Sequence, residues 1–417
     1  MRPKDESRTL ILLTNVFPFH DWEPFLETEI AYLTGFAAIE VFSLSVTDEH
    51  ARIRRTIENP LVDVHRVRRR PHWRYALGAP RVVFHQEFWS ELGMLRRTGA
   101  FTFPRLIELT AFLSRAIIEA RDVVRTLRDK GVKGRPILYA YRFYYQPYLA
   151  HLVAQSLREG VIVARAHRAD LYEEVSPTGY LPLRKWSLRH VKRLWLVAEH
   201  GRRYLAERYP DCADVLEVSY LGSRNEFGIA SRSQSRRPLR LVTCSTMVPV
   251  KRLDRLVRAL GLVDPGSVEW VHYGDGPLRD ELVALAAQEL DGRIDYRFAG
   301  ALGHDALMGE LWRGGFHLFA NVSESEGVPV SIMEASSFGI PVIATDVGGS
   351  SELVGSDNGT LLDADASPDA IAAAVRHFQS LDDDIYSSYA AAARRTWETK
   401  FDATRNYARF ASELAGF

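Results

Sequence analysis

The chain has 417 residues, more than one hydrophobic core usually supports, so at least two domains are expected. Hydrophobic residues make up 46% and charged residues 25%, as in an ordinary globular protein, and 53 basic side chains balance 53 acidic ones, so no global charge indicates nucleic-acid binding. Two cysteines give neither a disulfide framework nor a zinc spacing, the start does not resemble a signal peptide, and no apolar run approaches a membrane span.

The first apolar run, residues 9–14, predicts a buried parallel strand, and a helix is expected to begin at about Pro24. Ligands of open α/β sheets bind beyond the carboxyl ends of the strands, so the loop between the two elements is expected to face a cleft. Glu23 and Glu27 are the candidate groups there. An acid in the first turn of a helix, however, more often only complements the helix dipole.

Arginines gather between residues 52 and 74, and aromatic residues follow them closely. Basic residues beside aromatic ones can dock a protein on anionic lipid, where each cation contributes about 1 kcal/mol. A solvated run of charge explains the same pattern equally well. The arginines are Arg52, Arg54, Arg55, Arg66, Arg68, Arg69, Arg70 and Arg74.

Two further apolar runs, residues 137–141 and 161–164, predict strands. His167 and Asp170 follow the second of these runs. A lone histidine is usually structural, but one that lies just past a central strand is at the cleft. Asp170 could orient this histidine or cap the next helix.

The second half of the chain starts after a polar, basic segment, residues 223–237, which we interpret as an interdomain linker. Residues 239–244 predict a strand, and Lys251 and Arg252 lie in the turn that follows it. Residues 268–273 predict the next strand, which leads into a short glycine loop before a helix, a place that suits a nucleotide. This loop contains Gly274, Asp275, Gly276 and Pro277.

Residues 319–354 predict a short buried strand, a polar loop, a helix, a second strand and a glycine loop. Two carboxylates, Glu326 in the loop and Glu334 in the helix, have seven residues between them. The free N–H groups at the helix entry, together with the helix dipole, favour anion binding there. This entry consists of Gly327, Val328 and Pro329, the last at a helical position where proline is tolerated.

This spacing, within SESEGVPVSIMEA followed by GIPVIATDVGG, resembles the donor-binding signature of the retaining GT-B glycosyltransferases of family 4. The segment GDGPL after the strand at 268–273 is similar to another segment of that family. RAHRADLY, at residues 165–172, is similar to a segment of its polysaccharide-synthesising members. The resemblance is dense from residue 239 to about residue 414 and patchier from 10 to 221.

The resemblance implies an α/β protein of GT-B architecture, with two Rossmann-like doubly wound domains facing a central cleft. Residues 1–222 would form the N-terminal acceptor-side domain, 223–237 the linker, and 238–399 the C-terminal domain that binds the nucleotide-sugar donor. Residues 400–417 would cross back onto the first domain as a terminal helix.

The resemblance also implies roles for single residues. Glu326 would contact the transferred sugar, Glu334 would hold the ribose hydroxyls, Lys251 would contact the donor diphosphate, and His167 would lie close to the sugar. The catalytic candidates are thus His167, Glu326 and Lys251. The other donor-binding candidates are Arg252, Gly274, Asp275, Gly276, Pro277, Gly327, Val328, Pro329 and Glu334, and the acceptor-side candidates are Glu23, Glu27 and Asp170.

The sequence departs from the family at Thr246, where an arginine usually contacts the diphosphate. Without that arginine the charge of the departing nucleoside diphosphate is less stabilised, unless Arg252 or another basic group reaches it. No metal is expected. Asp363 and Asp365 have the D-x-D form of a metal site, but they lie in what we interpret as a turn.

The implied activity is a retaining, hexosyltransferase-type transfer of a sugar to a hydroxyl of a growing, lipid-linked glycan in cell-surface polysaccharide biosynthesis. The expected donor is a UDP- or GDP-sugar, with no other cofactor and no nucleic-acid partner. The expected location is cytoplasmic, or peripheral on the inner face of the cytoplasmic membrane through the arginines between residues 52 and 74.

Two other classes stay open. A GT-B scaffold subunit of low or no activity could bind a partner transferase or a glycan, and Thr246 favours it. A nucleotide-sugar epimerase of related fold would give product from the donor alone. A dinucleotide oxidoreductase fits less well, because no G-x-G-x-x-G follows a predicted strand.

Overall fold

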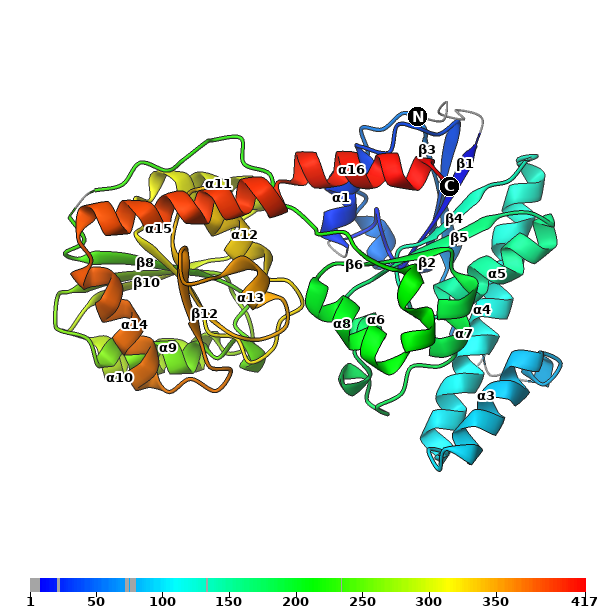
Figure 1. Cartoon of the computed structure of the whole chain (residues 1–417), viewed down its shortest axis with the longest axis horizontal. Helices are drawn as coiled ribbons and strands as arrows, with labels where there is room; N and C mark the ends of the chain where they lie inside the picture. Colours follow the sequence, from blue (N-terminus) through cyan, green and yellow to red (C-terminus); the bar gives the residue numbers. More distant parts are fainter. Residues whose placement is uncertain (1–7, 21–22, 72–74, 76–79, 133, 234) are drawn as a thin grey trace. The chain divides into compact units, whose positions relative to one another are not determined.

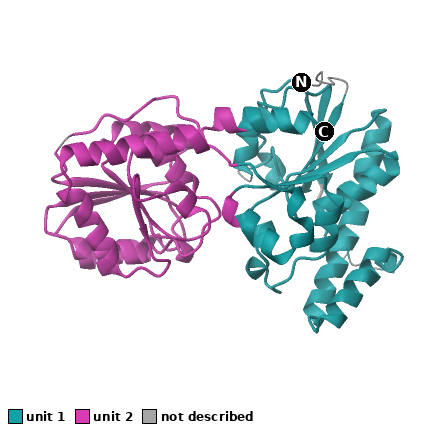
Figure 2. Cartoon of the chain, viewed as in Figure 1, with its two compact units in different colours: residues 1–197, 201–219, 407–417 teal, residues 198–200, 220–406 magenta. Residues whose placement is uncertain are grey.

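The structure is a computed structural model that describes residues 8–20, 23–71, 75, 80–132, 134–233 and 235–417. Trp73 and Arg74, which belong to the arginine-rich stretch and its aromatic neighbours, lie outside the described residues. The chain divides into two compact units (Figure 2). Unit 1 comprises residues 1–197, 201–219 and 407–417, and unit 2 comprises residues 198–200 and 220–406.

Unit 1 is built on a parallel sheet of seven strands in the order β3-β2-β1-β4-β5-β6-β7 (Figure 1). Chain order reverses between β1 and β4, which are direct neighbours, with Leu10 paired to Ile137. The strands are β1 (Thr9–Thr14), β2 (Ala38–Val46), β3 (Val62–Arg68), β4 (Ile137–Ala140), β5 (Val161–Ala166), β6 (Arg193–Leu196) and β7 (Leu216–Val218).

Both faces of this sheet are covered, which explains why its strands are continuous apolar runs. Successive side chains of a strand point to opposite faces. Ile11 and Leu13 therefore enter a core formed with α3, α4, α5, α7 and α8, whereas Leu10 and Leu12 enter a second core with α1 and α16. The helices are α1 (Pro24–Ile30), α3 (Gln86–Arg97), α4 (Phe103–Asp129), α5 (Gln146–Leu157), α6 (Arg168–Leu171), α7 (Arg184–His190), α8 (Glu199–Arg208) and α16 (Ala403–Ala415).

Unit 2 is built on a parallel sheet of six strands in the order β10-β9-β8-β11-β12-β13. Chain order reverses between β8 and β11, where Leu318 pairs with Leu241. The strands are β8 (Leu239–Cys244), β9 (Val268–Tyr273), β10 (Asp295–Gly300), β11 (Leu318–Asn321), β12 (Val342–Thr345) and β13 (Gly359–Leu362).

Helices α9, α10 and α14 supply Leu256, Leu290 and Phe378 to the main core of unit 2. The helices of this unit are α9 (Leu253–Gly261), α10 (Arg279–Leu290), α11 (His304–Arg313), α12 (Val330–Ser337), α13 (Ser350–Leu353), α14 (Pro368–Ser380) and α15 (Asp383–Thr396). Short 3-10 segments are η1 (His50–Arg52), η2 (Glu173–Val175), η3 (Pro210–Val215) and η4 (Pro249–Lys251), and η5 (Trp397–Phe401) is a π-helical turn.

Residues 223–237, interpreted from sequence as a linker, pack onto unit 2. Arg232 donates hydrogen bonds to the carbonyls of Phe338 and Gly339, and Arg236 forms an ion pair with Asp383. At the other end of unit 2, helix α16 continues past Asn406 into unit 1, where Phe410 and Leu414 are buried. The assignment of an acceptor-side and a donor-side domain stays a prediction.

The predicted fold class, two Rossmann-like doubly wound parallel sheets, is confirmed. The strands predicted at residues 9–14, 239–244 and 268–273 begin and end at the predicted residues, and the second strand predicted within residues 319–354 is β12. Among the described residues, no helix is long and apolar enough to cross a membrane.

Candidate active site

The loops after β8 and β11 begin side by side, because these strands are neighbours at the point where chain order reverses in unit 2. A crevice opens at such a point, since the chain leaves the two strands toward opposite faces of the sheet. Lys251 lies in the loop after β8 and Glu326 in the loop after β11. The Lys251 Nζ donates to Glu326 Oε1 at 2.7 Å, so the fold brings these two predicted residues together.

The Lys251–Glu326 pair is accessible to a ligand. The side chains keep 24% and 11% of their surface exposed, and Asn321 Nδ2 makes a further, longer contact of 3.4 Å with Glu326 Oε1. A lysine has three N–H donors, and a carboxylate has about four acceptor positions. Both groups therefore have hydrogen-bonding capacity left, and an anion near Lys251 could compete with Glu326 for the ammonium.

Glu334 is the second carboxylate of the signature and lies in α12. It is buried, and burial raises the pKa of its carboxyl to about 7. His304 Nδ1, at the start of α11, lies 3.3 Å from Glu334 Oε1. Among the described residues, no other hydrogen bond or ion pair reaches this carboxylate. A buried acid with so few partners is costly to ionise, and donors supplied by a ligand would lower that cost.

Cys244, the last residue of β8, is close enough to Glu334 and Lys251 for their charges to affect its thiol. Burial, followed by the nearby Glu334 carboxylate, raises the pKa of its thiol to about 12, while Lys251 acts in the opposite direction. The thiol is therefore neutral at physiological pH, and it lacks the low pKa that nucleophilic cysteines have. Cys244 therefore does not offer a nucleophile to this site.

The glycine loop after β9 is joined to the loop after β8 by backbone hydrogen bonds. Met247 N donates to the Asp275 carbonyl at 2.9 Å, and Leu278 N donates to the Met247 carbonyl at 3.1 Å. A Cβ atom at Gly274 would lie 1.9 Å from the Ser245 carbonyl oxygen, so only glycine fits there. Gly276 N donates to the exposed Asp275 carboxylate at 2.8 Å, and Pro277 is exposed at the entry to α10.

The loop that holds Glu326 is joined in the same way to the loop after β12. Gly349 N donates to the Gly327 carbonyl at 2.7 Å, and a Cβ atom at Gly348 would lie 2.1 Å from the Glu326 carbonyl oxygen. Val328 is half-buried, and Pro329 is buried at the N-cap of α12. Four loops at one edge of the sheet are therefore fixed against one another in pairs.

Arg252 and Thr246 occupy the same loop as Lys251. Arg252 has a left-handed backbone and forms ion pairs with Asp254 at 3.2 Å and Glu324 at 3.7 Å. Its guanidinium is therefore held by acids other than Glu326. Thr246 is exposed, so the position at which the resembled family has an arginine faces solvent.

The corresponding reversal point of unit 1 lies between β1 and β4, and the predicted residue Glu23 follows β1. Its buried carboxylate accepts hydrogen bonds from the backbone N–H groups of Asn15, Val16 and Phe17, all at 3.0–3.1 Å. Arg142, after β4, approaches it at 3.3 Å. The carboxylate is thus occupied by donors of its own loop. Glu27, in contrast, is exposed and pairs with Arg55 at 3.0 Å.

His167 follows β5 and packs against Tyr141, with 4.8 Å between the ring centroids. Its backbone N–H donates to Asp170 Oδ1 at 3.0 Å, and Asp170 also accepts from Phe143 N. Both ring nitrogens of His167 are buried, with no hydrogen-bond partner among the described residues. Burial, with the nearby Arg142 and Arg165, lowers the pKa of this imidazole well below its usual value. His167 is therefore neutral at pH 7 and can still donate or accept one hydrogen bond at each ring nitrogen.

Sequence reasoning missed a buried ion pair in unit 1. The Arg165 guanidinium donates to Glu29, both side chains are fully buried, and Tyr139 Oη donates to Glu29 at 3.0 Å. Arg165 also stacks over Phe410 of α16 at 4.1 Å. An arginine inside an apolar strand was a signal that could have prompted a search for an acidic partner, because buried arginines are rarely unpaired.

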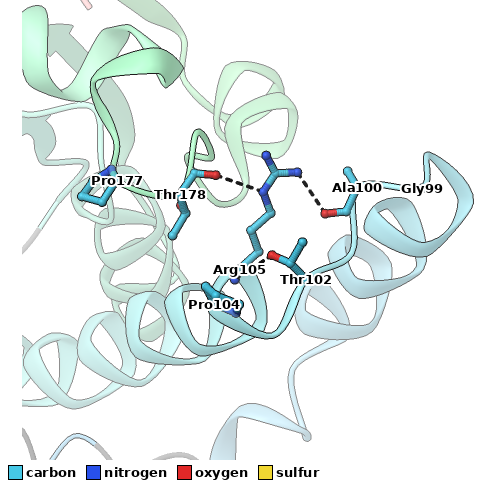
Figure 3. Close-up of a pocket in the computed structure, with 7 residues that line it drawn as sticks. All are labelled: Gly99, Ala100, Thr102, Pro104, Arg105, Pro177 and Thr178. Carbon is cyan, nitrogen blue, oxygen red and sulfur yellow. Dashed lines mark hydrogen bonds between the residues drawn. The ribbon is translucent and has the colours of Figure 1, made fainter.

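A hollow of about 530 Å³ in unit 1 shares no residue with these loops. Its wall includes the Arg105 guanidinium, which donates to the carbonyls of Ala100 at 2.9 Å and Thr178 at 3.2 Å (Figure 3). These carbonyls already use the donors of Arg105, so the arginine ties the start of α4 to a neighbouring loop. The hollow is lined by Gly99, Ala100, Thr102, Pro104, Arg105, Pro177 and Thr178.

Candidate metal ligands meet elsewhere than the sequence motif suggested. Asp363 and Asp365 are exposed in a turn after β13, as expected. Among the described residues, the one group of three potential ligands is Glu40, Asp63 and His65. The Lys130 ammonium already binds Glu40 and Asp63, so a cation of the protein itself fills this place.

Residues 238–380 match the family model described as Glycosyl transferases group 1. The amylovoran biosynthesis glycosyltransferase AmsK of Erwinia amylovora is 24% identical over 263 residues, which is 61% of this chain and 62% of the relative. The chain therefore spans less than two thirds of the length of that curated relative.

Two solved structures extend the likeness over nearly the whole chain. Anabaena Alr3699/HepE in complex with UDP aligns with a TM-score of 0.65 and 17% identity, covering 98% of this chain and 100% of that one. The lipopolysaccharide outer core galactosyltransferase WaaB in its apo form aligns with a TM-score of 0.67 and 14% identity, covering 98% and 99%. At these identities the likeness establishes the fold. Residues 238–380 thus match the group 1 glycosyltransferases, and the chain as a whole shares the GT-B fold of these two structures.

Proposed function

We propose that this protein transfers a sugar from a nucleoside-diphosphate sugar to a hydroxyl of a growing glycan, with retention of the anomeric configuration. The observation that carries the proposal is the Lys251–Glu326 pair, 2.7 Å long and partly exposed, at the reversal point of the unit 2 sheet. Ligands of doubly wound sheets bind at such points. The match of residues 238–380 to the glycosyltransferase family supports the same reading.

In the proposed reaction the bond between the anomeric carbon and the diphosphate breaks, and negative charge develops on the departing nucleoside diphosphate. Lys251 would move from Glu326 to that diphosphate and stabilise its charge, aided by the N–H groups at the entry to α12. Glu326, released from the lysine, would accept hydrogen bonds from the sugar and fix its position. The acceptor oxygen would attack from the side of the leaving group, and the diphosphate would take its proton.

Two further residues have proposed contacts with the donor or sugar. The buried Glu334 carboxylate would accept hydrogen bonds from the ribose hydroxyls. These bonds would replace the hydration that burial removes from the carboxylate. His167, neutral and with both ring nitrogens unsatisfied among the described residues, would bind a sugar hydroxyl. Asp170 would hold the histidine loop through the His167 N–H group.

We propose a UDP-sugar as the donor, with a GDP-sugar as the alternative, and no metal. The solved structures with the same fold include one in complex with UDP and glucose and one in complex with UDP-glucose. For the acceptor we propose a lipid-linked glycan of cell-surface polysaccharide biosynthesis, met at the inner face of the cytoplasmic membrane. The name of the AmsK relative, an amylovoran biosynthesis enzyme, supports this acceptor class.

A panel of UDP-, GDP- and ADP-sugars, measured by thermal shift and by diphosphate release, tests the proposal. We expect one donor to raise the melting temperature and to be hydrolysed slowly, equally with and without EDTA. Loss of hydrolysis in EDTA would overturn the metal-free part of the proposal. Release of an epimerised sugar nucleotide from the donor alone would replace transfer by epimerisation.

Alanine variants of the pair test the assigned roles. Removal of one group that stabilises developing charge commonly lowers turnover by about a hundredfold or more, and we expect this for Lys251→Ala and Glu326→Ala. Lys185→Ala is the matched control, because Lys185 also pairs with an acid, Asp211, at 3.1 Å, but on an exposed surface. If both site variants stay within about threefold of wild type, short of the tenfold that about 1.4 kcal/mol represents, the assignment fails.

A second candidate function is a scaffold that binds the donor or a glycan without transferring sugar. The exposed Thr246, at the position of the usual arginine, favours it, because one cation for the leaving diphosphate is absent. This candidate predicts a thermal shift with a nucleotide sugar but neither hydrolysis nor transfer. The variant Thr246→Arg would then raise donor affinity without restoring turnover.

A further inference from the structure

The N-terminal part of unit 1 carries an arm, defined here as residues 81–108, that consists of α3, the following loop and the start of α4 (Figure 1). Figure 1 shows α3 lying beside one end of α4, away from the strands of unit 1. Large apolar side chains are exposed along this arm, and Phe84 and Phe103 have 86% and 69% of their surface accessible. The exposed apolar residues are Val83, Phe84, Trp89, Phe101, Phe103 and Ile107.

The acidic side chains of the arm all turn inward. Glu91 is buried and accepts hydrogen bonds from Tyr180 Oη at 2.8 Å and Leu183 N at 3.0 Å. Glu87 accepts from Tyr148 Oη at 3.2 Å, and Glu108 accepts from Thr178 Oγ1 and from Tyr144 Oη at 3.3 Å. Each acid of the arm is therefore bonded to the body of unit 1.

The basic side chains of the arm, apart from the carbonyl-bound Arg105, turn outward. Arg81, Arg96 and Arg97 are exposed, and no ion pair joins any of them to another residue in the described part of the chain. Arg96 lies 5.6 Å from the centre of the Phe101 ring, a cation–π distance. The outer surface of the arm thus combines exposed aromatic rings with arginines that form no ion pair in the described part of the chain, while Glu91 is buried and Glu87 and Glu108 are half-buried.

These side chains share faces of the elements that carry them. Trp89 and Arg96 are seven residues apart in α3, which places them on one face of the helix. Phe103 and Ile107 are four residues apart in α4 and likewise share a face. Thr102, between Phe101 and Phe103, has an extended backbone, so these two rings leave the chain on the same side.

We propose that the outer surface of this arm docks on an anionic lipid bilayer. Aromatic side chains partition into the interfacial region of a membrane, and each arginine near an anionic surface adds attraction. A protein partner is less well matched, because the unpaired arginines would need acids in register, whereas anionic headgroups are mobile and adapt to any spacing. The inference goes beyond sugar transfer and does not depend on it.

The arginine-rich stretch that the sequence suggested for this role is less suitable. Arg55, Arg66 and Arg70 of that stretch form ion pairs with Glu27, Asp48 and Asp122. Their charge is therefore largely neutralised within unit 1. Arg52 and Arg54 are exposed and provide the test of that alternative.

Co-sedimentation of the full chain with vesicles tests the proposal. We expect binding to mixed phosphatidylglycerol and phosphatidylcholine vesicles, weakened by salt, and little binding to phosphatidylcholine alone. The double variants Phe101→Ser/Phe103→Ser and Arg96→Gln/Arg97→Gln should each lower binding to the mixed vesicles about tenfold. All four side chains are exposed, so the variants should melt at the wild-type temperature.

Two matched controls separate the arm from other surfaces. Ile229→Ser/Ile385→Ser removes two exposed apolar side chains of unit 2, and Arg52→Gln/Arg54→Gln removes two exposed arginines of the arginine-rich stretch. Both should bind vesicles as wild type does. Absence of vesicle binding by the wild type, or wild-type binding by both arm variants, would overturn the proposal. It would also be overturned if the wild type were dimeric by light scattering without lipid and Phe101→Ser/Phe103→Ser were monomeric, because the arm would then contact a second copy.

Discussion

Both sheets have a carboxylate after a strand at the point where chain order reverses, but the two carboxylates are in different states. In unit 1, Glu23 accepts from three backbone N–H groups and is closed off from solvent. In unit 2, Glu326 has one lysine as its main partner and stays partly exposed. Each acid therefore lies in a loop that leaves its sheet at the reversal point, Glu23 after the first strand of unit 1 and Glu326 after the fourth strand of unit 2. The number of donors within the protein then decides whether that acid closes a loop or can receive a ligand.

Two deeply buried acids show the same contrast. Glu29 in unit 1 has both Arg165 and Tyr139 as partners, whereas Glu334 in unit 2 contacts, within the described part of the chain, only the exposed His304. Burial raises the pKa of both carboxyls. The difference is that Glu29 accepts hydrogen bonds from donors of the protein itself, while Glu334 has acceptor positions left for a ligand. We therefore expect substitutions at Glu29 to act on stability and those at Glu334 to act also on donor binding.

The largest expected effect follows from breaking the Glu29–Arg165 pair. Glu29→Ala leaves the Arg165 guanidinium buried without its acid, and loss of one partner of a buried ion pair costs about 3–5 kcal/mol. Urea denaturation followed by tryptophan fluorescence should show this loss in the transition of unit 1, where Trp195 is buried.

The double variant Glu29→Met/Arg165→Met separates the pair from the space it fills. Replacement of a buried ion pair by apolar groups is often close to neutral, so the double variant should be more stable than Glu29→Ala. If the double variant were less stable than Glu29→Ala, the ion pair would contribute more to the free energy of unfolding than the neutralisation of its two charges. Donor-induced stabilisation of unit 2 should survive in either variant.

The next effect concerns pH and Glu334. Because burial raises the pKa of this carboxyl from 4.5 to about 7, the folded protein keeps the proton at pH values where the unfolded chain has lost it. The folded state therefore binds more protons between these values, and the free energy of unfolding falls as pH rises from about 4.5 to about 7. The loss is about 3 kcal/mol in total.

Glu334→Gln should abolish this contribution, so the stability difference between variant and wild type should change in favour of the variant as pH rises. Chemical denaturation at several pH values measures this difference. A UDP-sugar whose ribose donates to the ionised carboxylate should also bind wild type more tightly above about pH 7 and should bind the variant with little dependence on pH. Parallel stability curves for the two proteins would contradict the assigned burial effect.

A smaller effect is expected from alanine substitutions at two glycines of unit 2, which separate the effect of a steric contact from the effect of backbone strain. Gly348 and Gly266 both have left-handed backbones, with φ of 58° and 70°, so alanine is strained at either position by about 1 kcal/mol. At Gly266 the added Cβ atom meets nothing within 4 Å, whereas at Gly348 it would lie 2.1 Å from the Glu326 carbonyl oxygen. Gly348→Ala must therefore move the Glu326 loop, and Gly266→Ala need not.

Titration calorimetry with the donor identified in the panel tests this pair of variants. We expect Gly348→Ala to weaken donor binding about tenfold, which is about 1.4 kcal/mol, and Gly266→Ala to leave it unchanged. Equal affinities in the two variants would show that the position of the Glu326 loop does not limit donor binding.

The sequence predicted the parts of the site that local chemistry determines. Buried parallel strands are continuous apolar runs, so β1, β8, β9 and β12 could be located, and residues after them could be assigned to loops at the carboxyl edge. The closeness of Lys251 and Glu326 follows from the strand order, which the resemblance supplied. The strands could therefore be located from the apolar runs, whereas the contact between Lys251 and Glu326 could be expected only from the strand order that the resemblance implied.

The sequence could not predict which partner each charged group would choose. Glu23 and Glu27 were equal candidates, and only the folded loop shows that the first is bonded by three N–H groups while the second pairs with Arg55. The Glu29–Arg165 pair joins residues 136 positions apart, a distance that no local pattern spans. Likewise, the inward direction of the acids of the arm and the outward direction of its arginines depend on how α3 packs on unit 1.

The smallest expected effect lies at Glu27, and it sharpens the contrast with Glu23. The Glu27 side chain is 53% exposed and contacts Arg55, whose guanidinium also lies 5.0 Å from the Phe17 ring. An exposed ion pair contributes about 0–1 kcal/mol, so Glu27→Gln should leave both stability and transfer close to wild type. Glu23→Gln is the matched comparison, because the neutral amide weakens three charge-assisted hydrogen bonds and should destabilise unit 1 clearly more. A marked loss of transfer in Glu27→Gln, at unchanged melting temperature, would instead identify Glu27 as an acceptor contact and reverse the ranking of the two acids.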